Sequence, residues 1–246
     1  MISQTLGQCL SGAGFALRGF RWLARPGLRR FIVVPLLVNL MVFGAAISYS
    51  LTAFSGWLES LLPQSLGWLW WVALPIMALV ILVVVFFTFT LVANLLASPF
   101  NDRLAERVAD KLEHPIMESE RSAGWAGQVV KAAFNELGKW LYFALLALLA
   151  LACWVFPPTT ILAPLVWLMV GVWIFAFEYL DYPLGNAGLS FSGKHGWIKH
   201  HRWYALGFGA TLTGMTMIPL VNFAVMPAAV CGATELWVFC ERRQRS

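Results

Sequence analysis

The sequence is poor in charge: Asp, Glu, Lys and Arg make up 12% of its 246 residues, and 60% are hydrophobic. A soluble domain carries about 25% charged residues. The shortage is concentrated in four stretches that contain none of these four residue types. They lie between Arg30 and Glu59, Glu59 and Asp102, Lys139 and Glu178, and Arg202 and Glu235. A spanning helix needs roughly 20 apolar residues, so each stretch is long enough to cross a membrane. The composition predicts an all-α integral membrane protein.

The motifs of soluble enzymes and metal proteins are also lacking. The four cysteines form no CxxC pair, so buried free thiols are expected rather than a disulfide or a metal site. His195, His200 and His201 do not have the i,i+4 spacing of helical zinc ligands, and a solvated basic loop is expected there. The sequence contains no Gly-rich phosphate loop, nucleophile elbow or HExxH. We therefore expect no enzyme activity, no metal and no cofactor.

An N-terminal amphipathic helix is predicted over residues 1–26. Its apolar positions recur at helical spacing, and its arginines gather on another side. The apolar positions are Ile2, Leu6, Leu10, Ala13, Leu17 and Phe20, and the arginines are Arg18, Arg21 and Arg25. This pattern is typical of a helix that lies along the membrane interface, but a helix packed on the rest of the protein has the same pattern. The first strong apolar run is too long for a cleavable signal, so the N-terminus is expected to be retained.

The remainder of the single predicted domain contains two long helices, a polar region and two hairpins. Spanning helices are expected over 31–57 and 66–97. A charged cytoplasmic helical region follows over 98–139, and its helix is predicted to begin after Ser98-Pro99-Phe100. Helical hairpins are expected over 140–177 and 203–238.

Each predicted hairpin is broken by proline into two limbs, which sit at the lower length limit for spanning. The limbs are either tilted spanning helices or a hairpin that enters the membrane partway. A re-entrant turn must have its backbone polar groups satisfied inside the apolar layer. The polar residues Thr159, Thr160 and Asn222 at the tips are suited to that task.

The distribution of basic residues predicts the orientation. All seventeen Lys and Arg residues lie in four segments, and none lies between the two predicted spanning helices. The segments are 18–30, 103–139, 194–202 and 242–245. An even number of predicted crossings separates each segment from the next, so all four can lie on one side. The positive-inside rule makes that side cytoplasmic. No acid lies inside a predicted spanning segment, which favours passive conduction over a proton relay.

A basic turn, Gly27-Leu28-Arg29-Arg30, precedes the first spanning segment. The first N–H groups of a helix lack internal partners and carry partial positive charge, and arginine adds planar donors for tetrahedral oxyanions. The turn therefore has the features of an anion site, although two arginines can also merely anchor the cytoplasmic end of a helix. Because no carboxylate occurs before Glu59, a site built only of donors suits fully deprotonated sulfate, provided that no distant acid such as Glu106 folds close to the turn.

Several blocks of the sequence resemble the CysZ family of bacterial sulfate permeases, and they follow the family's order over nearly the whole chain. The blocks are Pro26-Gly27-Leu28-Arg29-Arg30-Phe31, Pro35-Leu36-Leu37-Val38-Asn39, Ser98-Pro99-Phe100-Asn101-Asp102-Arg103-Leu104-Ala105-Glu106, Glu178-Tyr179-Leu180-Asp181-Tyr182-Pro183 and Ile218-Pro219-Leu220-Val221-Asn222-Phe223. Each block alone is a weak signal, whereas the ordered set is specific.

The resemblance implies a multi-pass protein of the bacterial inner membrane that admits sulfate for cysteine biosynthesis. It implies two full spanning helices, two partly penetrating hairpins and assembly into homo-oligomers. Its sulfate site falls on Gly27, Leu28, Arg29 and Arg30, and its central polar network on Arg103 and Glu106. The expected partners are therefore sulfate, the lipid bilayer and further copies of the chain, with no nucleic acid. The alternative function is a membrane scaffold or regulatory subunit of another transporter or biosynthetic enzyme.

Overall fold

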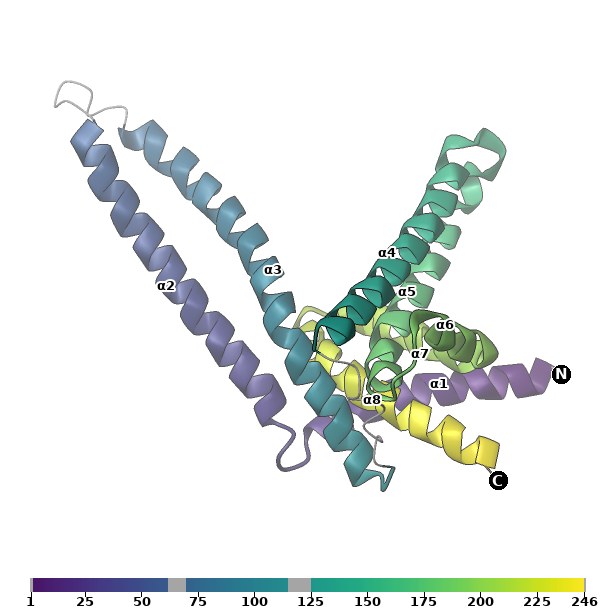
Figure 1. Cartoon of the computed structure of the whole chain (residues 1–246). Helices are drawn as coiled ribbons and strands as arrows, with labels where there is room; N and C mark the ends of the chain where they lie inside the picture. The colour runs from purple at the N-terminus through teal and green to yellow at the C-terminus, as the bar shows by residue number, and fades with distance from the viewer. Residues whose placement is uncertain (1, 62–69, 115–124, 246) are drawn as a thin grey trace. The chain divides into compact units, whose positions relative to one another are not determined.

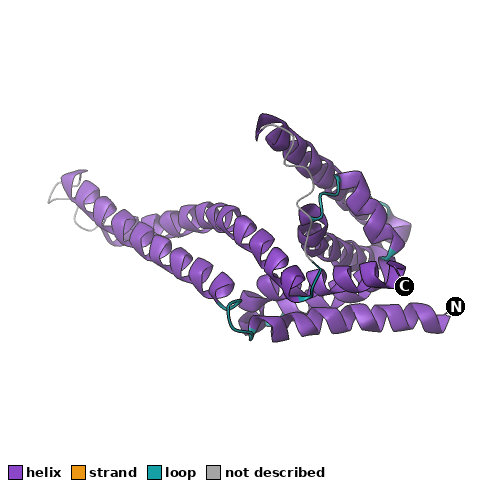
Figure 2. Cartoon of the chain, turned by 60° about the horizontal axis from the view of Figure 1, so that its bottom comes forward, coloured by secondary structure: helices purple, strands orange, loops and turns teal. Residues whose placement is uncertain are grey.

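The computed structural model describes residues 2–61, 70–114 and 125–245, and every regular element in these ranges is a helix. Figure 2 shows these helices joined by loops. The predicted all-α class is therefore confirmed. The chain divides into two compact units. We call Arg30–Phe100 the α2–α3 unit, and Met1–Arg29 together with Asn101–Ser246 the main unit.

The α2–α3 unit contains α2 (Arg30–Leu61) and most of α3 (Trp70–Lys111), both labelled in Figure 1. With 32 and 42 residues, the helices are about 48 and 63 Å long, more than the roughly 30 Å of a hydrocarbon layer. The predicted segment 31–57 lies within α2. The predicted segment 66–97 begins outside the described residues and continues in α3.

α3 continues through the position where the sequence predicted the start of a separate charged helix. The predicted helix start after Ser98-Pro99-Phe100 is wrong, because one continuous helix runs from Trp70 through Pro99 to Lys111. A proline removes a single backbone hydrogen bond, and long helices of membrane proteins accommodate that loss. The charged residues that follow Pro99 therefore belong to the same helix as the apolar residues before them.

In the main unit, α1 (Ile2–Leu23) packs against α7 (Arg202–Thr216) and α8 (Pro219–Arg245). Its packed side consists of residues that are at most 7% exposed, namely Phe15, Ala16, Trp22 and Leu23. The predicted apolar row is on another side, since Leu6, Leu10 and Leu17 remain 59%, 64% and 53% exposed. α1 is therefore packed on the protein without burying the leucines on which the interfacial prediction rests.

Glycines set how closely α1 approaches its neighbours. A Cβ on Gly12 would overlap the backbone carbonyl of Tyr204 in α7, and a Cβ on Gly207 would overlap that of Cys9 in α1. Small residues allow helix backbones to approach to this distance, which is a common packing solution in membrane proteins. Gly12 of α1 is thus required by this packing, whereas a Cβ on Gly7 of the same helix would meet no atom within 4 Å.

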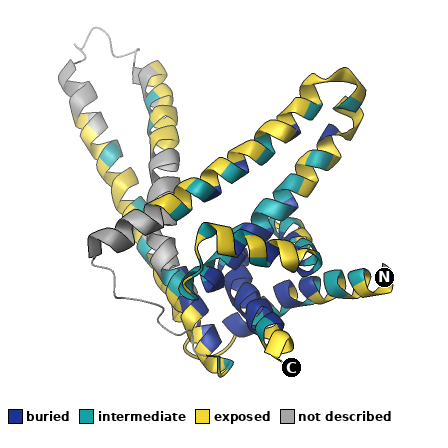
Figure 3. Ribbon diagram, turned by 45° about the vertical axis from the view of Figure 1, so that its right-hand side comes forward, coloured by how far each residue is buried: buried dark blue, intermediate teal, exposed yellow. Residues whose placement is uncertain are grey.

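α4 (Trp125–Val155) and α5 (Ala163–Asn186) form a hairpin through the 3₁₀ helix η2 (Pro157–Leu162). Figure 3 shows that exposed residues predominate along it, in contrast to the buried centre of the main unit. At its tip, the Thr159 hydroxyl donates to the carbonyls of Cys153 and Phe156 at 3.0 and 2.9 Å. The predicted role of Thr159 in satisfying backbone groups at the tip is confirmed.

α6 (Phe191–His200) lies where a basic loop was predicted, so that prediction is wrong. The Ser190 hydroxyl caps the helix by accepting from the Gly193 amide at 3.5 Å. Capping by serine stabilises a helix start, which explains how this polar, glycine-containing segment becomes helical. His200 ends α6, and His201 forms the turn into α7.

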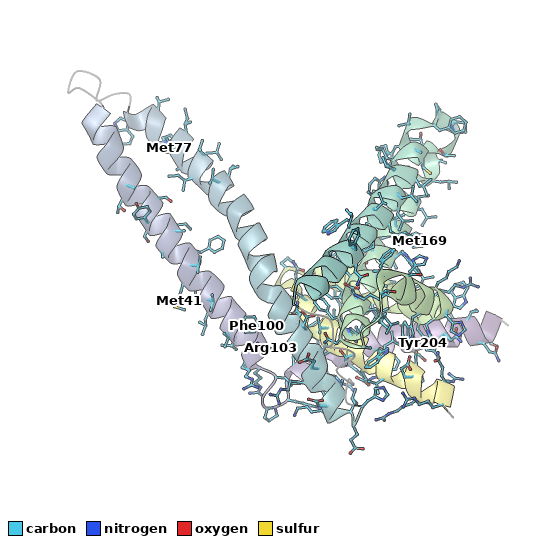
Figure 4. The ribbon with its side chains drawn as sticks, viewed as in Figure 1. Met41, Met77, Phe100, Arg103, Met169 and Tyr204 are labelled. Carbon is cyan, nitrogen blue, oxygen red and sulfur yellow. The ribbon has the colours of Figure 1, made fainter. Side chains whose placement is uncertain are left out.

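Within the described residues, three helical segments have the length and composition of membrane spans. These are Phe134–Val155, Pro157–Asn186 and Ala224–Arg245. Shorter apolar segments lie at Leu40–Ser50 in α2 and Pro75–Val84 in α3. Figure 4 labels methionines on three of these helices, Met41 on α2, Met77 on α3 and Met169 on α5. The chain is an integral membrane protein by these properties.

Candidate functional site

The basic turn connects α1 to α2. α1 ends at Leu23 and α2 begins at Arg30, so Gly27, Leu28 and Arg29 precede the first turn of α2. Gly27 has φ +87°, a left-handed conformation that glycine adopts without steric cost. Leu28 is only 1% exposed and fixes the turn to the main unit. The glycine and the leucine together set the course of the backbone, which brings the two arginines to the start of α2.

Arg29 is held by the end of α1. Its Nε and Nη2 atoms donate to the Ala24 carbonyl oxygen at 3.2 and 2.9 Å. This carbonyl follows the C-terminus of α1, where the helix dipole favours a cation. A guanidinium has five N–H donors in one plane, so a two-point contact orients the plane while other donors point elsewhere. Arg29 and Arg30 are both exposed.

The electrostatics of the turn favour an anion. Arg29 and Arg30 each carry a permanent positive charge, and the first backbone N–H groups of α2 add partial positive charge. The chain contains no carboxylate before Glu59. Such a set of donors binds tetrahedral oxyanions, and it offers no group that performs covalent chemistry.

Arg103 and Glu106 lie in α3 on its exposed side, and Figure 4 labels Arg103. The opposite side of this part of α3 is fully buried, with Leu104, Ala105, Val108 and Ala109 at 0% exposure. A helix that alternates in this way presents its charges to its surroundings and its small apolar residues to the protein core. The predicted polar network around Arg103 and Glu106 therefore remains a hypothesis.

A different ionic network lies at the base of the α4–α5 hairpin. The side chain of Lys139 is only 8% exposed, and its Nζ lies 3.1 Å from Glu136, 3.5 Å from Glu178 and 3.3 Å from Asp181. The second oxygen of Asp181 lies 2.7 Å from Nζ of Lys194 in α6. Asp181 therefore bridges two lysines and ties α4, α5 and α6 together through charge.

The charged end of α3 joins this base through two hydrogen bonds. Asn101, 4% exposed, donates to the Tyr182 hydroxyl at 3.3 Å, and Asn186 donates to the Asp102 carbonyl at 2.9 Å. The pKa of the Asp102 side chain is raised to about 6, mainly by burial and also by the nearby carboxylates Asp181 and Glu106, while Lys194 opposes the shift. The base is thus a region where carboxylates outnumber lysines.

This network was not predicted from the sequence. We expected no acid in a spanning segment, whereas Glu178 and Asp181 lie within the apolar segment Pro157–Asn186. The available signal was that the charge-free stretch that begins at Lys139 ends at Glu178, with Asp181 one helical turn further on. Acids in an apolar segment require partners, so carboxylates in such a segment and a nearby lysine together indicate an ion pair.

Comparisons with known proteins agree over nearly the whole chain. The family model described as "Sulfate transporter CysZ/Etoposide-induced protein 2.4" matches residues 15–227. A protein of Pseudomonas paraeruginosa named sulfate transporter CysZ is 37% identical over 235 residues, which cover 93% of this chain and 95% of the relative. Proteins with the same name are 35% identical in Vibrio cholerae, covering 96% of both chains, and 32% identical in Pectobacterium atrosepticum, covering 96% of this chain and 87% of the relative.

Proposed function

Because the chain belongs to the sulfate transporter CysZ/etoposide-induced protein 2.4 family, we propose that it transports sulfate across a membrane. The observation that carries this proposal is the match to proteins named sulfate transporter along almost the full length of both chains. We extend it to uptake through the bacterial inner membrane, with the sulfate used for cysteine biosynthesis. The basic segments would then face the cytoplasm, as the positive-inside rule requires.

In this proposal, sulfate is held by the turn Gly27-Leu28-Arg29-Arg30. Gly27 allows the ligand to approach the backbone, buried Leu28 fixes the turn, and the Ala24 carbonyl orients the Arg29 guanidinium. Sulfate at neutral pH only accepts hydrogen bonds, which suits a set of donors without a carboxylate. Arg103 and Glu106 are proposed as a polar station further along α3, and their exposure is consistent with contact to a hydrated anion.

The environment of the protein is part of the same proposal. The exposed leucines of α1 would lie along the membrane interface, and the exposed apolar sides of α4 and α5 would contact lipid or further copies of the chain. Soluble monomers rarely expose apolar surfaces as extensive as these. We therefore propose a multi-pass homo-oligomer in which the hairpins are covered by lipid or by subunits.

The test is uptake of radiolabelled sulfate into proteoliposomes that contain only this protein. The variant Arg29→Ala/Arg30→Ala removes two charge-assisted contacts, each worth roughly 1.5–3 kcal/mol. Sulfate binding should fall by at least about a hundredfold, and uptake at low sulfate should be lost. The matched control is Arg21→Ala/Arg107→Ala, which removes two exposed arginines that lie outside the turn.

The outcomes separate the competing interpretations. Equal loss in the control variant would show that the arginines of the turn act only as general cytoplasmic anchors. Unchanged binding in a folded Arg29→Ala/Arg30→Ala variant would refute the site but leave the transport proposal intact. Absence of flux with the wild-type protein alone would refute transport and favour a scaffold or regulatory subunit.

A further inference from the structure

A second donor-rich pocket lies in the main unit, where α1, the α6–α7 turn and the end of α8 meet. It has a volume of about 260 Å³. It is lined by Gln8, His200, His201, Tyr204, Phe239, Cys240, Arg243 and Gln244. None of these described lining residues is Asp or Glu. The pocket therefore combines a cation and several neutral donors with an aromatic wall formed by Tyr204 and Phe239. Figure 4 labels Tyr204 on α7.

The polar side chains of the pocket are positioned by neighbouring groups. Arg243 donates from Nη1 to the Tyr204 hydroxyl at 3.0 Å, and Tyr204 is itself only 6% exposed. Nδ1 of His201 lies 3.0 Å from the Trp197 carbonyl oxygen, which can only accept, so Nδ1 carries the proton. The unprotonated Nε2 then accepts from the Gln244 amide at 3.1 Å. Burial lowers the pKa of His201, which keeps this neutral tautomer at neutral pH.

The positive charge extends beyond the pocket along the α6–α7 turn. His200 also lines a neighbouring hollow together with Gly196, Lys199, Arg202 and Trp203. The acid nearest in sequence to Arg243 is Glu241, and its Oε1 accepts from the Trp197 indole N–H at 3.0 Å. The basic groups thus gather around the pocket. The Glu241 carboxylate instead accepts from Trp197, and neither residue lines the pocket. Such a field attracts anions and raises their local concentration.

We propose that this pocket binds a small tetrahedral oxyanion of the sulfate or phosphate class, held by Arg243 and His200 with the amides of Gln8 and Gln244. Arginine supplies the planar pair of donors that such oxyanions prefer, and the neutral amides add hydrogen bonds. A free solute and the phosphate of a lipid headgroup present the same chemistry. The site is separate from the basic turn at Gly27–Arg30, because the two sites share no lining residue.

The experiment uses full-length protein with the substitutions Arg29→Ala/Arg30→Ala, so that binding at the proposed transport site does not contribute. Radiolabelled sulfate and inorganic phosphate are titrated by equilibrium dialysis in a neutral detergent. We expect saturable binding at one site per chain. Adding Arg243→Gln should weaken it at least tenfold, because a charge-assisted contact is lost. The matched control Arg245→Gln removes an exposed arginine of the same helix end that does not line the pocket, and it should leave the affinity unchanged.

A second variant guards against misfolding. His200→Gln changes an exposed side chain on a different helix and should also weaken binding, by a smaller factor than Arg243→Gln. The thermal midpoint of each variant verifies that the fold is intact. Absence of saturable binding in the Arg29→Ala/Arg30→Ala background would overturn the proposal. Equal affinities of the Arg243→Gln and Arg245→Gln variants would overturn it as well.

The source of the oxyanion is decided in nanodiscs. If a lipid headgroup occupies the pocket, phosphatidylglycerol discs should abolish sulfate binding that phosphatidylcholine discs preserve. If the natural ligand is a free solute, both discs should preserve binding that depends on Arg243. Sulfate flux is not measured in either arm. A failure here is therefore distinguishable from a failure of the transport proposal.

Discussion

The α4–α5 hairpin and the α7–α8 hairpin are both pairs of apolar helices that contain prolines near their turns, but they are buried to different extents. In their most apolar parts, 17% of Phe134–Val155 and 22% of Pro157–Asn186 are buried inside the protein, against 72% of Ala224–Arg245. Hydropathy alone does not separate the two cases, because lipid and protein interior are similarly apolar. The difference lies in side-chain size and in the position of α1.

α8 is enclosed because its small residues permit close packing. Ala228, Ala229 and Ala233 are fully buried, and a Cβ on Gly19 of α1 would overlap the Ala228 carbonyl. A polar contact reinforces this interface, since Glu235 accepts from Arg18 at 2.8 Å and from the Trp22 indole at 2.7 Å. α4 instead presents bulky side chains such as Leu148, 62% exposed. The α4–α5 hairpin is therefore held at its base by charge, and α8 along its length by packing.

The largest effect is expected at the base of the α4–α5 hairpin. Lys139→Met removes a nearly buried cation that pairs with three carboxylates, of which Asp181 is mostly buried, and we expect a loss of about 3–5 kcal/mol. The thermal midpoint in detergent should fall by roughly 2–4 °C for each kcal/mol. The control Glu136→Gln removes a 53% exposed partner and should change stability by less than about 1 kcal/mol. A Lys139→Met variant as stable as the wild type would show that charge does not hold the hairpin.

Truncation of one leucine in each hairpin tests the packing difference directly. Leu236→Ala in α8 removes a fully buried side chain and should cost about 2–5 kcal/mol through lost burial and a cavity. Leu148→Ala in α4 removes a 62% exposed side chain and should change stability by at most about 0.5 kcal/mol. Both changes are measured by thermal unfolding in the same detergent. Similar losses at the two positions would contradict the contrast between the hairpins.

Two glycine substitutions should have opposite signs. Gly207→Ala in α7 places a Cβ against the Cys9 backbone and should destabilise by about 1–3 kcal/mol. Gly171→Ala in α5 meets no atom within 4 Å and should stabilise by up to about 1 kcal/mol, since alanine favours a helix. Thermal midpoints compare the two variants. Stabilisation by Gly207→Ala would mean that α1 is not packed as closely as described.

The smallest effect concerns the pH dependence at Asp102. The pKa of this carboxyl is about 6 in the folded protein, above its ordinary value of 3.8. The folded state therefore binds more protons between these values, and this group favours folding more strongly as the pH falls from 7 toward 4. Asp102→Asn should raise the thermal midpoint at pH 7.5 by a few °C at most, and by less at pH 5. The exposed Asp110→Asn variant on the same helix should show no such dependence.

Much of the architecture follows from local pattern. Charge-free stretches of membrane length predicted the helical membrane class, and the proline-threonine block predicted the tip where Thr159 satisfies backbone carbonyls. The basic turn was recognisable because Gly27 and two arginines precede an apolar helix, and its backbone conformation agrees with that reading. Its binding of sulfate stays a prediction. Local rules failed at two places. At Pro99 the helix continues through the proline, and at α6 the Ser190 cap stabilises a helix in a polar segment.

The sequence by itself determined that this chain is a helical membrane protein, where its charge lies and to which family it is similar. Hydropathy, helix periodicity and motif order act over short spans of chain, so they can be read locally. Only the tertiary structure decided which side of α1 is buried, that Asp181 bridges Lys139 and Lys194, and that Gln8 and Arg243 share a pocket. These residues are far apart in the chain, and their contacts depend on how closely the helix backbones approach, which glycines and alanines permit.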